Sequence, residues 1–266
     1  MRIPITMCHG IRESGELPLT PERFDALVKV ARELDYESID YNDLAEWMAG
    51  TPELPERSIM FDFDHPVKSM RYEIDDVLSR YGYSGNLFIN TLPMNDMYAG
   101  PMPPDDEREY MTWDEVGELM EKGWHMGSHT VTHPNLSQLS TEDPTGESIR
   151  QELEACDATL KKKLGITSQD FAFTSTTWSS SAEKEVMKRY RFGRLWIVGN
   201  VYEVDGGEIR YADLVEIAGD DEADGGPPMA ARYITRDSNP YRLPSMEFQA
   251  LIHEPDAFRK YLEWPL

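Results

Sequence analysis

The feature that most constrains the fold of this sequence is a regular alternation of short apolar runs with segments in which apolar residues recur at helical spacing. The apolar runs, which are typical of buried strands, lie at residues 3–8, 58–63, 86–90, 125–128, 171–173 and 195–198. The helical patterns lie at residues 20–34, 42–49, 68–80, 112–123, 147–164 and 182–190. Such alternation predicts an α/β fold in which helices cover a parallel sheet that is either open or closed into a barrel.

Local signals mark the ends of several predicted helices. Thr20-Pro21-Glu22 combines an N-cap residue, a proline at the first helical position and an acidic side chain in the first turn. Thr112 followed three residues later by Glu115 is the pattern of a capping box. Gly165 is placed to end the long helix at 147–164.

Composition excludes several classes of protein. The chain has 266 residues, of which 40% are hydrophobic, so a disordered chain is excluded and a sizeable core is expected. The net charge of −23 disfavours binding to nucleic acid or to anionic membranes. No apolar stretch is long enough to span a membrane, and no signal peptide is visible. We therefore expect a cytoplasmic protein, with Cys8 and Cys156 as reduced thiols.

The same alternation bears on domain organisation. A single domain over residues 1–266 is expected, because barrel-like α/β folds reach about 200–250 residues without dividing. Residues 203–245 interrupt the alternation and are rich in Gly, Asp and Pro. We predict that this segment is an irregular acidic loop.

Ionisable residues gather where predicted strands end. His9 follows the first strand, Asp62, Asp64 and His65 end the second, and His129 and His133 follow another. In parallel α/β folds the ligand binds at the carboxyl ends of the strands. Buried acids beside histidines are costly unless a charge compensates them, and a bound metal ion would do so.

The two histidines of the segment 129–133 are four residues apart, which places two imidazoles on one face of a helical turn. Two neutral imidazoles can bind one divalent metal. Because no glutamate follows the first histidine, the pattern is not that of the helical metalloproteases. The alternative to a metal site is that these histidines are simply buried in the core or exposed to solvent. The acids at positions 62 and 64 favour the metal site.

These segments resemble the polysaccharide deacetylases, carbohydrate esterase family four. The family's first motif, T-F-D-D-G, aligns with Asp62-Phe63-Asp64-His65-Pro66, and its second motif, G-S-H-T-x-x-H-P-x-L, aligns closely with residues 127–136. Residues 5–11, ITMCHGI, resemble the M-Y-H-G-I opening of one branch, which includes poly-N-acetylglucosamine deacetylases. The resemblance covers roughly residues 3–200 and implies a distorted (β/α)7 barrel.

The resemblance also implies an activity, the hydrolysis of an N-acetyl or O-acetyl group on a sugar with a divalent metal that is usually zinc. Carried over by position, Asp64 is the general base and His9 the general acid. The metal ligands are His65, His129 and His133, with histidine where the family has aspartate. A three-histidine site still suits zinc but suits hard cations such as magnesium less well.

Departures from the family pattern leave alternatives open. In another register Asp62 is the base and Asp64 the ligand, since strand alternation turns both to one side. The third motif, R-x-P-Y, aligns with Phe173-Thr174-Ser175-Thr176, which lacks its arginine, proline and tyrosine. Arg191 or Arg194 are candidates to replace the missing arginine.

Other residues have secondary roles in this interpretation. Trp178 follows the altered third motif and is the candidate for stacking on a sugar ring. We expect His125 and His253 to be structural.

The predicted function is metal-dependent removal of an acetyl group from a small-molecule or oligosaccharide substrate. A catalytically inactive carbohydrate-binding relative and an amidohydrolase acting on another small C–N substrate are the alternatives. The oligomeric state is left open.

Overall fold

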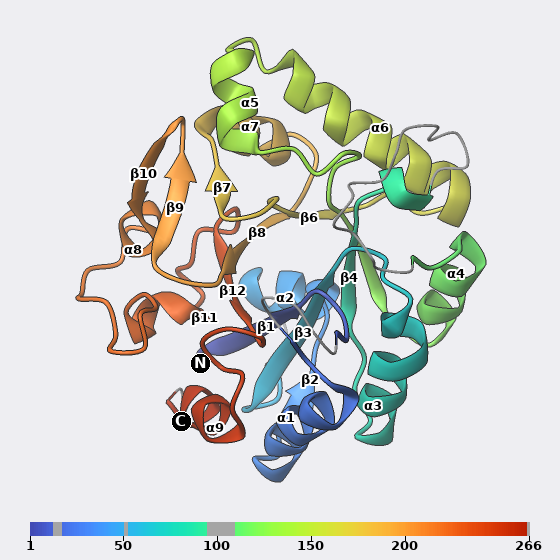
Figure 1. Ribbon diagram of the computed structural model, residues 1–266, viewed down its shortest axis with the longest axis vertical. Coiled ribbons are helices and arrows are strands. Elements are labelled where there is room, and N and C mark those ends of the chain that lie inside the picture. Colours follow the sequence, from blue (N-terminus) through green and yellow to red (C-terminus); the bar gives the residue numbers. More distant parts are fainter. Residues whose placement is uncertain (13–17, 51–52, 95–109, 265–266) are drawn as a thin grey trace.

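The computed structural model describes residues 1–12, 18–50, 53–94 and 110–264, and seven parallel strands lie at its centre (Figure 1). In spatial order these strands are β1 (Ile3–Cys8), β12 (Leu243–Glu247), β8 (Phe192–Ile197), β6 (Asp170–Ala172), β5 (His125–Ser128), β4 (Asn86–Ile89) and β3 (Ser58–Asp64). A further parallel pairing of β1 with β3, in which Met7 lies opposite Asp62, closes the sheet on itself. The predicted (β/α)7 barrel is therefore confirmed.

Strand β3 shows why these strands read as nearly continuous apolar runs. All of its residues are buried, since helices cover one face and the barrel interior encloses the other. Ile59, Phe61 and Phe63 belong to the main core cluster beneath the helices. Met60 belongs to a second cluster with Phe88 of β4 and residues of other strands. By alternation, Asp62 and Asp64 project to the same side as Met60.

Helices surround the barrel, as the periodicity predicts (Figure 1). They are α1 (Pro21–Glu33), α2 (Tyr41–Met48), α3 (Asp75–Arg80), α4 (Trp113–Glu121), α5 (Leu136–Glu142), α6 (Glu147–Leu164), α7 (Ser180–Met187) and α9 (Pro255–Glu263). Thr20 caps α1, Thr112 and Glu115 form the capping box of α4, and Gly165 ends α6 with a φ of 74°. A π-helical turn, Met70–Ile74, precedes α3.

The segment 203–245 differs from the irregular loop that we predicted. Strands β9 (Val201–Val204) and β10 (Gly207–Arg210) form an antiparallel hairpin, and β9 also pairs with β7 (Thr177–Trp178). The hairpin turn is Asp205-Gly206, both at positive φ, which is a common two-residue turn. The segment also contains three short elements and the start of β12; the short elements are α8 (Tyr211–Leu214), a 3₁₀ turn (Met229–Arg232) and β11 (Tyr233–Ile234).

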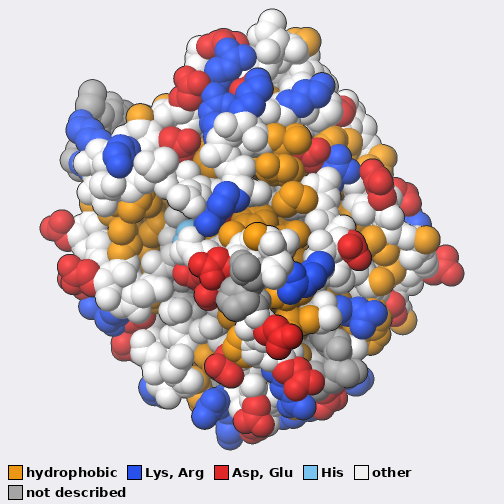
Figure 2. All heavy atoms as spheres, turned by 180° about the vertical axis from the view of Figure 1, so that it is seen from behind, with side chains coloured by type: hydrophobic (Ala, Val, Ile, Leu, Met, Phe, Trp, Pro, Cys, Tyr) orange, Lys and Arg blue, Asp and Glu red, His pale blue; other side chains and the backbone are white. Residues whose placement is uncertain are grey.

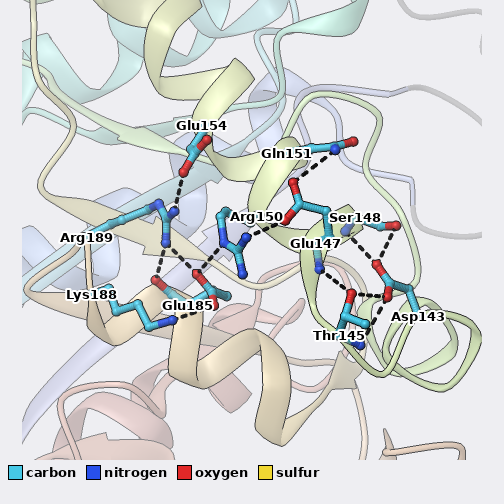
Figure 3. Close-up of polar contacts among 10 residues, drawn as sticks. All are labelled: Asp143, Thr145, Glu147, Ser148, Arg150, Gln151, Glu154, Glu185, Lys188 and Arg189. Carbon is cyan, nitrogen blue, oxygen red and sulfur yellow. Dashed lines mark hydrogen bonds and ion pairs between the residues drawn. The ribbon is translucent and has the colours of Figure 1, made fainter.

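An ion-pair network joins α6 to α7 on the outside of the barrel (Figure 3). Glu185 of α7 is almost fully buried and accepts from Lys188 and Arg189, and Arg150 of α6 lies 3.5 Å from the same carboxylate. Burial alone would raise the pKa of Glu185, but the hydrogen bonds from Lys188 and Arg189 outweigh it and lower the pKa to about 2. Arg189 extends the network to Glu154.

The surface carries both signs of charge. Figure 2 shows acidic and basic side chains lying close together on one face of the molecule, with apolar side chains between them. Among the described residues, no helix has the length and apolar character needed to cross a bilayer.

Candidate metal centre

Three histidines meet beyond the carboxyl ends of the barrel strands. His65 directly follows β3, His129 directly follows β5, and His133 lies four residues farther along. One ring nitrogen from each lies within 4.8 Å of the other two, close enough for all three to hold one metal ion. Among the described residues, no other three Asp, Glu, His or Cys side chains come together in this way. The ring centroids are 4.7 to 5.3 Å apart. The structure confirms the prediction that these three side chains lie close together.

Two of the rings are fixed through the nitrogen that faces away from the cluster. His65 Nδ1 lies 2.9 Å from Asn90 Oδ1, and His129 Nδ1 lies 2.8 Å from the carbonyl oxygen of Ala172. A hydrogen bond of this kind sets the tautomer and the orientation of a metal-binding imidazole. In each ring, Nε2 is then the nitrogen that would bind a metal ion.

His129 provides the sharpest test of whether the cluster fits a metal. Its Nε2 is buried and has no hydrogen-bond partner among the described residues. Burial lowers the pKa of His129 well below its usual value, and electrostatic interactions with His133 and Arg194 lower it further. The ring is therefore neutral at neutral pH, which is the form that binds a metal. A buried, neutral and unpartnered nitrogen facing two other imidazoles fits a soft or borderline divalent cation.

The backbone at the cluster is unusual. His65, Thr130 and His133 have φ values of 66°, 67° and 59°, in the left-handed region that non-glycine residues rarely adopt. The expected helical turn over residues 129–133 is therefore wrong. A loop brings the two histidines together, because Pro134 disfavours a helical conformation at His133 and the intervening residues are β-branched.

A buried ion-pair group lies next to the histidines. Arg194 of β8 is fully buried; it donates to Asp64 and its Nε lies 3.4 Å from Asp62 Oδ2. Burial opposes the charge on Arg194, but the carboxylates of Asp64 and Asp62 outweigh burial and raise its pKa. Arg194, rather than Arg191, thus contacts the acids of the first motif. Arg191 pairs with Asp170 instead.

The two acids of the first motif face different partners. Asp64 Oδ2 lies 3.9 Å from His129 Nε2, at the edge of the histidine cluster. Asp62 accepts hydrogen bonds from Tyr41 and Asn86 in the barrel interior. Burial raises the pKa of Asp62 to about 7, although Arg194 and the two hydrogen bonds favour its charged form. Among the described residues, His65 rather than Asp64 belongs to the group of three possible ligands, as the Asp64/His65 register predicts. Which of the two registers describes the catalytic roles stays a prediction.

His9 approaches the cluster from β1. Its ring centroid lies 5.5 Å from that of His65, and its Nδ1 lies 3.0 Å from Glu247 Oε2 at the end of β12. The Glu247 carboxylate is fully buried and also accepts from Trp196 Nε1 and from the backbone N–H of Gln249. These contacts hold a carboxylate on one nitrogen of His9 while the ring lies beside the histidine cluster.

The sequence comparison then decides the family. The polysaccharide deacetylase family matches residues 51–192, which include the first two motifs and three histidines of the cluster. The chain belongs to the polysaccharide deacetylase family. The narrower resemblance to the branch with the M-Y-H-G-I opening stays a prediction.

Individual relatives of this family are distant. YxkH of Bacillus subtilis, itself named as a polysaccharide deacetylase, is 19% identical over 146 residues, which span 55% of this chain and 48% of YxkH. Streptococcus pyogenes deacetylase PplD, solved in complex with acetate, has a similar fold with a TM-score of 0.70, 14% identity and 98% coverage of both chains. IcaB from Ammonifex degensii has a TM-score of 0.64 and 16% identity, with 73% of this chain and 83% of that one covered.

Within this deacetylase fold, the remaining predicted residues lie away from the histidine cluster or stay untested. Trp178 is 6% exposed, donates to Glu183 and is covered by the guanidinium of Arg242 at 4.8 Å from its ring. Its role in sugar stacking stays a prediction. His253 is exposed, and His125 begins β5 and lies 2.9 Å from Asp170.

Sequence reasoning missed two residues that support the centre. Asn90 follows β4 and Glu247 ends β12, so the rule that strand ends carry the ligand-binding residues could have found both. The apolar run at 86–90 predicts only a strand, although Asn90 is its polar end. The predicted irregular loop at 203–245 ends inside β12, so the sequence pattern does not indicate the strand that carries Glu247.

Proposed function

We propose that the chain is a metal-dependent carbohydrate deacetylase. It would hydrolyse an acetyl group from an N-acetylated or O-acetylated sugar, either a small molecule or an oligosaccharide, in the cytoplasm. The observation that carries the proposal is the convergence of His65, His129 and His133 beside the carboxylate of Asp64. Family membership supports the reaction class, and the substrate within that class is part of the proposal.

The three histidines would hold a divalent cation, and zinc is the ion that suits imidazole ligands and a three-residue site best. When bound, such an ion lowers the pKa of a coordinated water and polarises a carbonyl oxygen. The contribution of the chain is to present neutral, oriented imidazoles. His65 and His129 do so through their hydrogen bonds to Asn90 and Ala172.

Asp64 would act as the general base. Its Oδ1 accepts from Arg194, which fixes the plane of the carboxylate, while Oδ2 is the oxygen nearest His129 Nε2. In this role Asp64 accepts a proton from the attacking water at the edge of the cluster. Arg194 of β8 would orient this carboxylate in place of the arginine that the altered third motif lacks.

His9 would act as the general acid. Glu247 engages Nδ1, so Nε2 is the atom that can deliver a proton to the leaving amine or alcohol. The Trp196 N–H bonds to the same carboxylate oxygen and keeps Glu247 in place. An inactive carbohydrate-binding relative would need neither a base held by a buried arginine nor a histidine held by a buried carboxylate.

Metal removal tests the proposed function directly. We expect protein treated with a chelator to lose acetate release from acetylated chitooligosaccharides and acetylated monosaccharides, and added Zn²⁺ to restore it. The measurement is acetate quantified enzymatically, alongside metal content by atomic absorption. Stoichiometric zinc with no acetate release from any substrate of the panel would identify a binding protein instead. Release that persists in fully metal-free protein would contradict the proposal.

Glu247→Gln tests the role of His9. The amide keeps the size of the side chain but removes the negative charge that faces Nδ1, so we expect kcat to fall about 10- to 100-fold. KM and zinc content should change little, because Glu247 belongs to neither the cluster nor the surface. Steady-state kinetics and metal analysis provide the measurements. Glu254→Gln, at an exposed carboxylate paired with Arg23, is the control and should match the wild type. A Glu247→Gln variant with unchanged kcat would show that His9 needs no such partner.

A further inference from the structure

One side chain from outside the histidine cluster binds the loop between two of its members. Glu152, a half-buried residue of α6, accepts from the backbone N–H groups of Val131 and Thr132 through Oε2, at 2.8 and 2.9 Å. Its Oε1 accepts from the Thr132 hydroxyl at 2.7 Å. Three donors of one turn therefore converge on one carboxylate that lies 20 residues away in the sequence.

The loop needs such support because its backbone is strained. Thr130 and His133, on either side of the two bonded N–H groups, both have positive φ. Non-glycine residues stay in this region only where surrounding contacts hold them there. The Thr130 hydroxyl accepts from the N–H of His133 at 3.0 Å, which links the two strained residues within the loop.

The other edge of the loop is held by residues that follow β4. The N–H groups of Thr91 and Leu92 donate to the carbonyl oxygens of Thr130 and Val131, at 3.2 and 3.0 Å. The carbonyl groups of the loop are thus held from the barrel, and its N–H groups are held from α6. Glu152 is the contact that fixes the loop from the helix layer.

The chemistry of the contact favours a carboxylate. An ionised carboxyl group has only acceptor sites, so it can satisfy two backbone N–H groups and a hydroxyl at once. A glutamine could keep all three contacts, with its oxygen on the N–H groups and its NH₂ on the hydroxyl, whereas a leucine would keep none. Hydrogen bonds to an ionised acceptor are also stronger than those to a neutral amide.

We infer that Glu152 is a positioning residue of the metal centre, which sets the separation of His129 and His133 by fixing the turn between them. The inference rests on the proposed function insofar as the histidine cluster binds a metal. It assigns the affinity for that metal partly to a helix that contributes no ligand.

Glu152→Leu in the full chain tests this role, because leucine removes all three acceptor contacts. We expect the affinity for Zn²⁺, measured by competition with a chromogenic chelator, to fall about 10- to 100-fold, the usual effect of losing a group that orients metal ligands. With Co²⁺ in place of Zn²⁺, we expect the visible absorption bands to shift or weaken, because the positions of the imidazoles change. Thermal unfolding of the metal-free protein reports the purely structural contribution.

Two further variants complete the experiment. Glu154→Leu makes the same change at a carboxylate of the same helix that pairs with Arg189 on the outer face, as Figure 3 shows, and should leave Zn²⁺ affinity and the Co²⁺ spectrum unchanged. Thr132→Val removes only the hydroxyl contact and should weaken Zn²⁺ binding about two- to fivefold. If Glu152→Leu does not fold, Thr132→Val decides the question.

Each outcome has a defined meaning. A folded Glu152→Leu variant with wild-type Zn²⁺ affinity and Co²⁺ spectrum overturns the inference, even if its melting temperature falls, since Glu152 would then be a structural residue only. Unchanged affinity in Thr132→Val, where that variant decides, overturns it as well. Wild-type protein that binds neither Zn²⁺ nor Co²⁺ would instead contradict the proposed metal-dependent function.

Discussion

Replacing His129 with alanine should abolish metal retention and leave the barrel folded. The substitution removes the buried Nε2 that faces the cluster, and two imidazoles alone hold zinc weakly. It also removes the contact with the Ala172 carbonyl, so we expect a loss of about 1–3 kcal/mol in the free energy of unfolding. Metal content after dialysis, far-UV circular dichroism and urea unfolding measure these effects.

His125→Ala is the matched control for this experiment. His125 is the first residue of β5, the strand that His129 directly follows, and it pairs with Asp170. We expect this variant to lose a comparable amount of stability and to retain its metal. Full zinc occupancy in His129→Ala would refute the assignment of His129 as a ligand.

Asp64→Asn should lower kcat by a factor of about 10² to 10⁴ and leave metal content unchanged. The amide has the shape of the carboxylate but does not accept a proton, so the proposed general base is lost while the three histidines remain. Arg194 keeps its contact with Asp62, whose Oδ2 lies 3.4 Å from Nε, and this limits the structural damage. Rates of acetate release and metal analysis on the same preparation give both quantities.

The same experiment separates the two possible registers of the first motif. If Asp62 were the base and Asp64 a ligand, Asp64→Asn would lose metal, and Asp62→Asn would show the larger loss of rate. We expect the reverse, with Asp62→Asn reducing the free energy of unfolding more than the rate, because Asp62 bonds to Tyr41 and Asn86 inside the barrel.

The barrel was predictable because its strongest signals are local. Apolar runs such as that of β3 and helix boundaries such as Thr112 and Gly165 depend on a few neighbouring residues, and the structure confirms them. Strand β12 was missed for the opposite reason. Its sequence, LPSME, has a proline and two polar residues, and it is a strand because β1 and β8 flank it.

The histidine cluster was predictable only in part. Strand-end residues and the family motifs together point to His65, His129 and His133, and the structure brings these three together. The conformation of the loop was not predicted, since the four-residue spacing suggests a helix and the positive φ values at Thr130 and His133 depend on distant contacts. The support from Glu152 comes from the middle of a helix 20 residues away, so no local pattern reveals it.

The strand that precedes His9 is also the strand at which the barrel closes. β1 hydrogen-bonds to β3 on one side and to β12 on the other, and His9 is the first residue after it. A shift of β1 by a single residue against either neighbour would invert which of its side chains face inward and would carry His9 away from Glu247. The strand pairing that closes the barrel therefore also sets the position of the proposed proton donor.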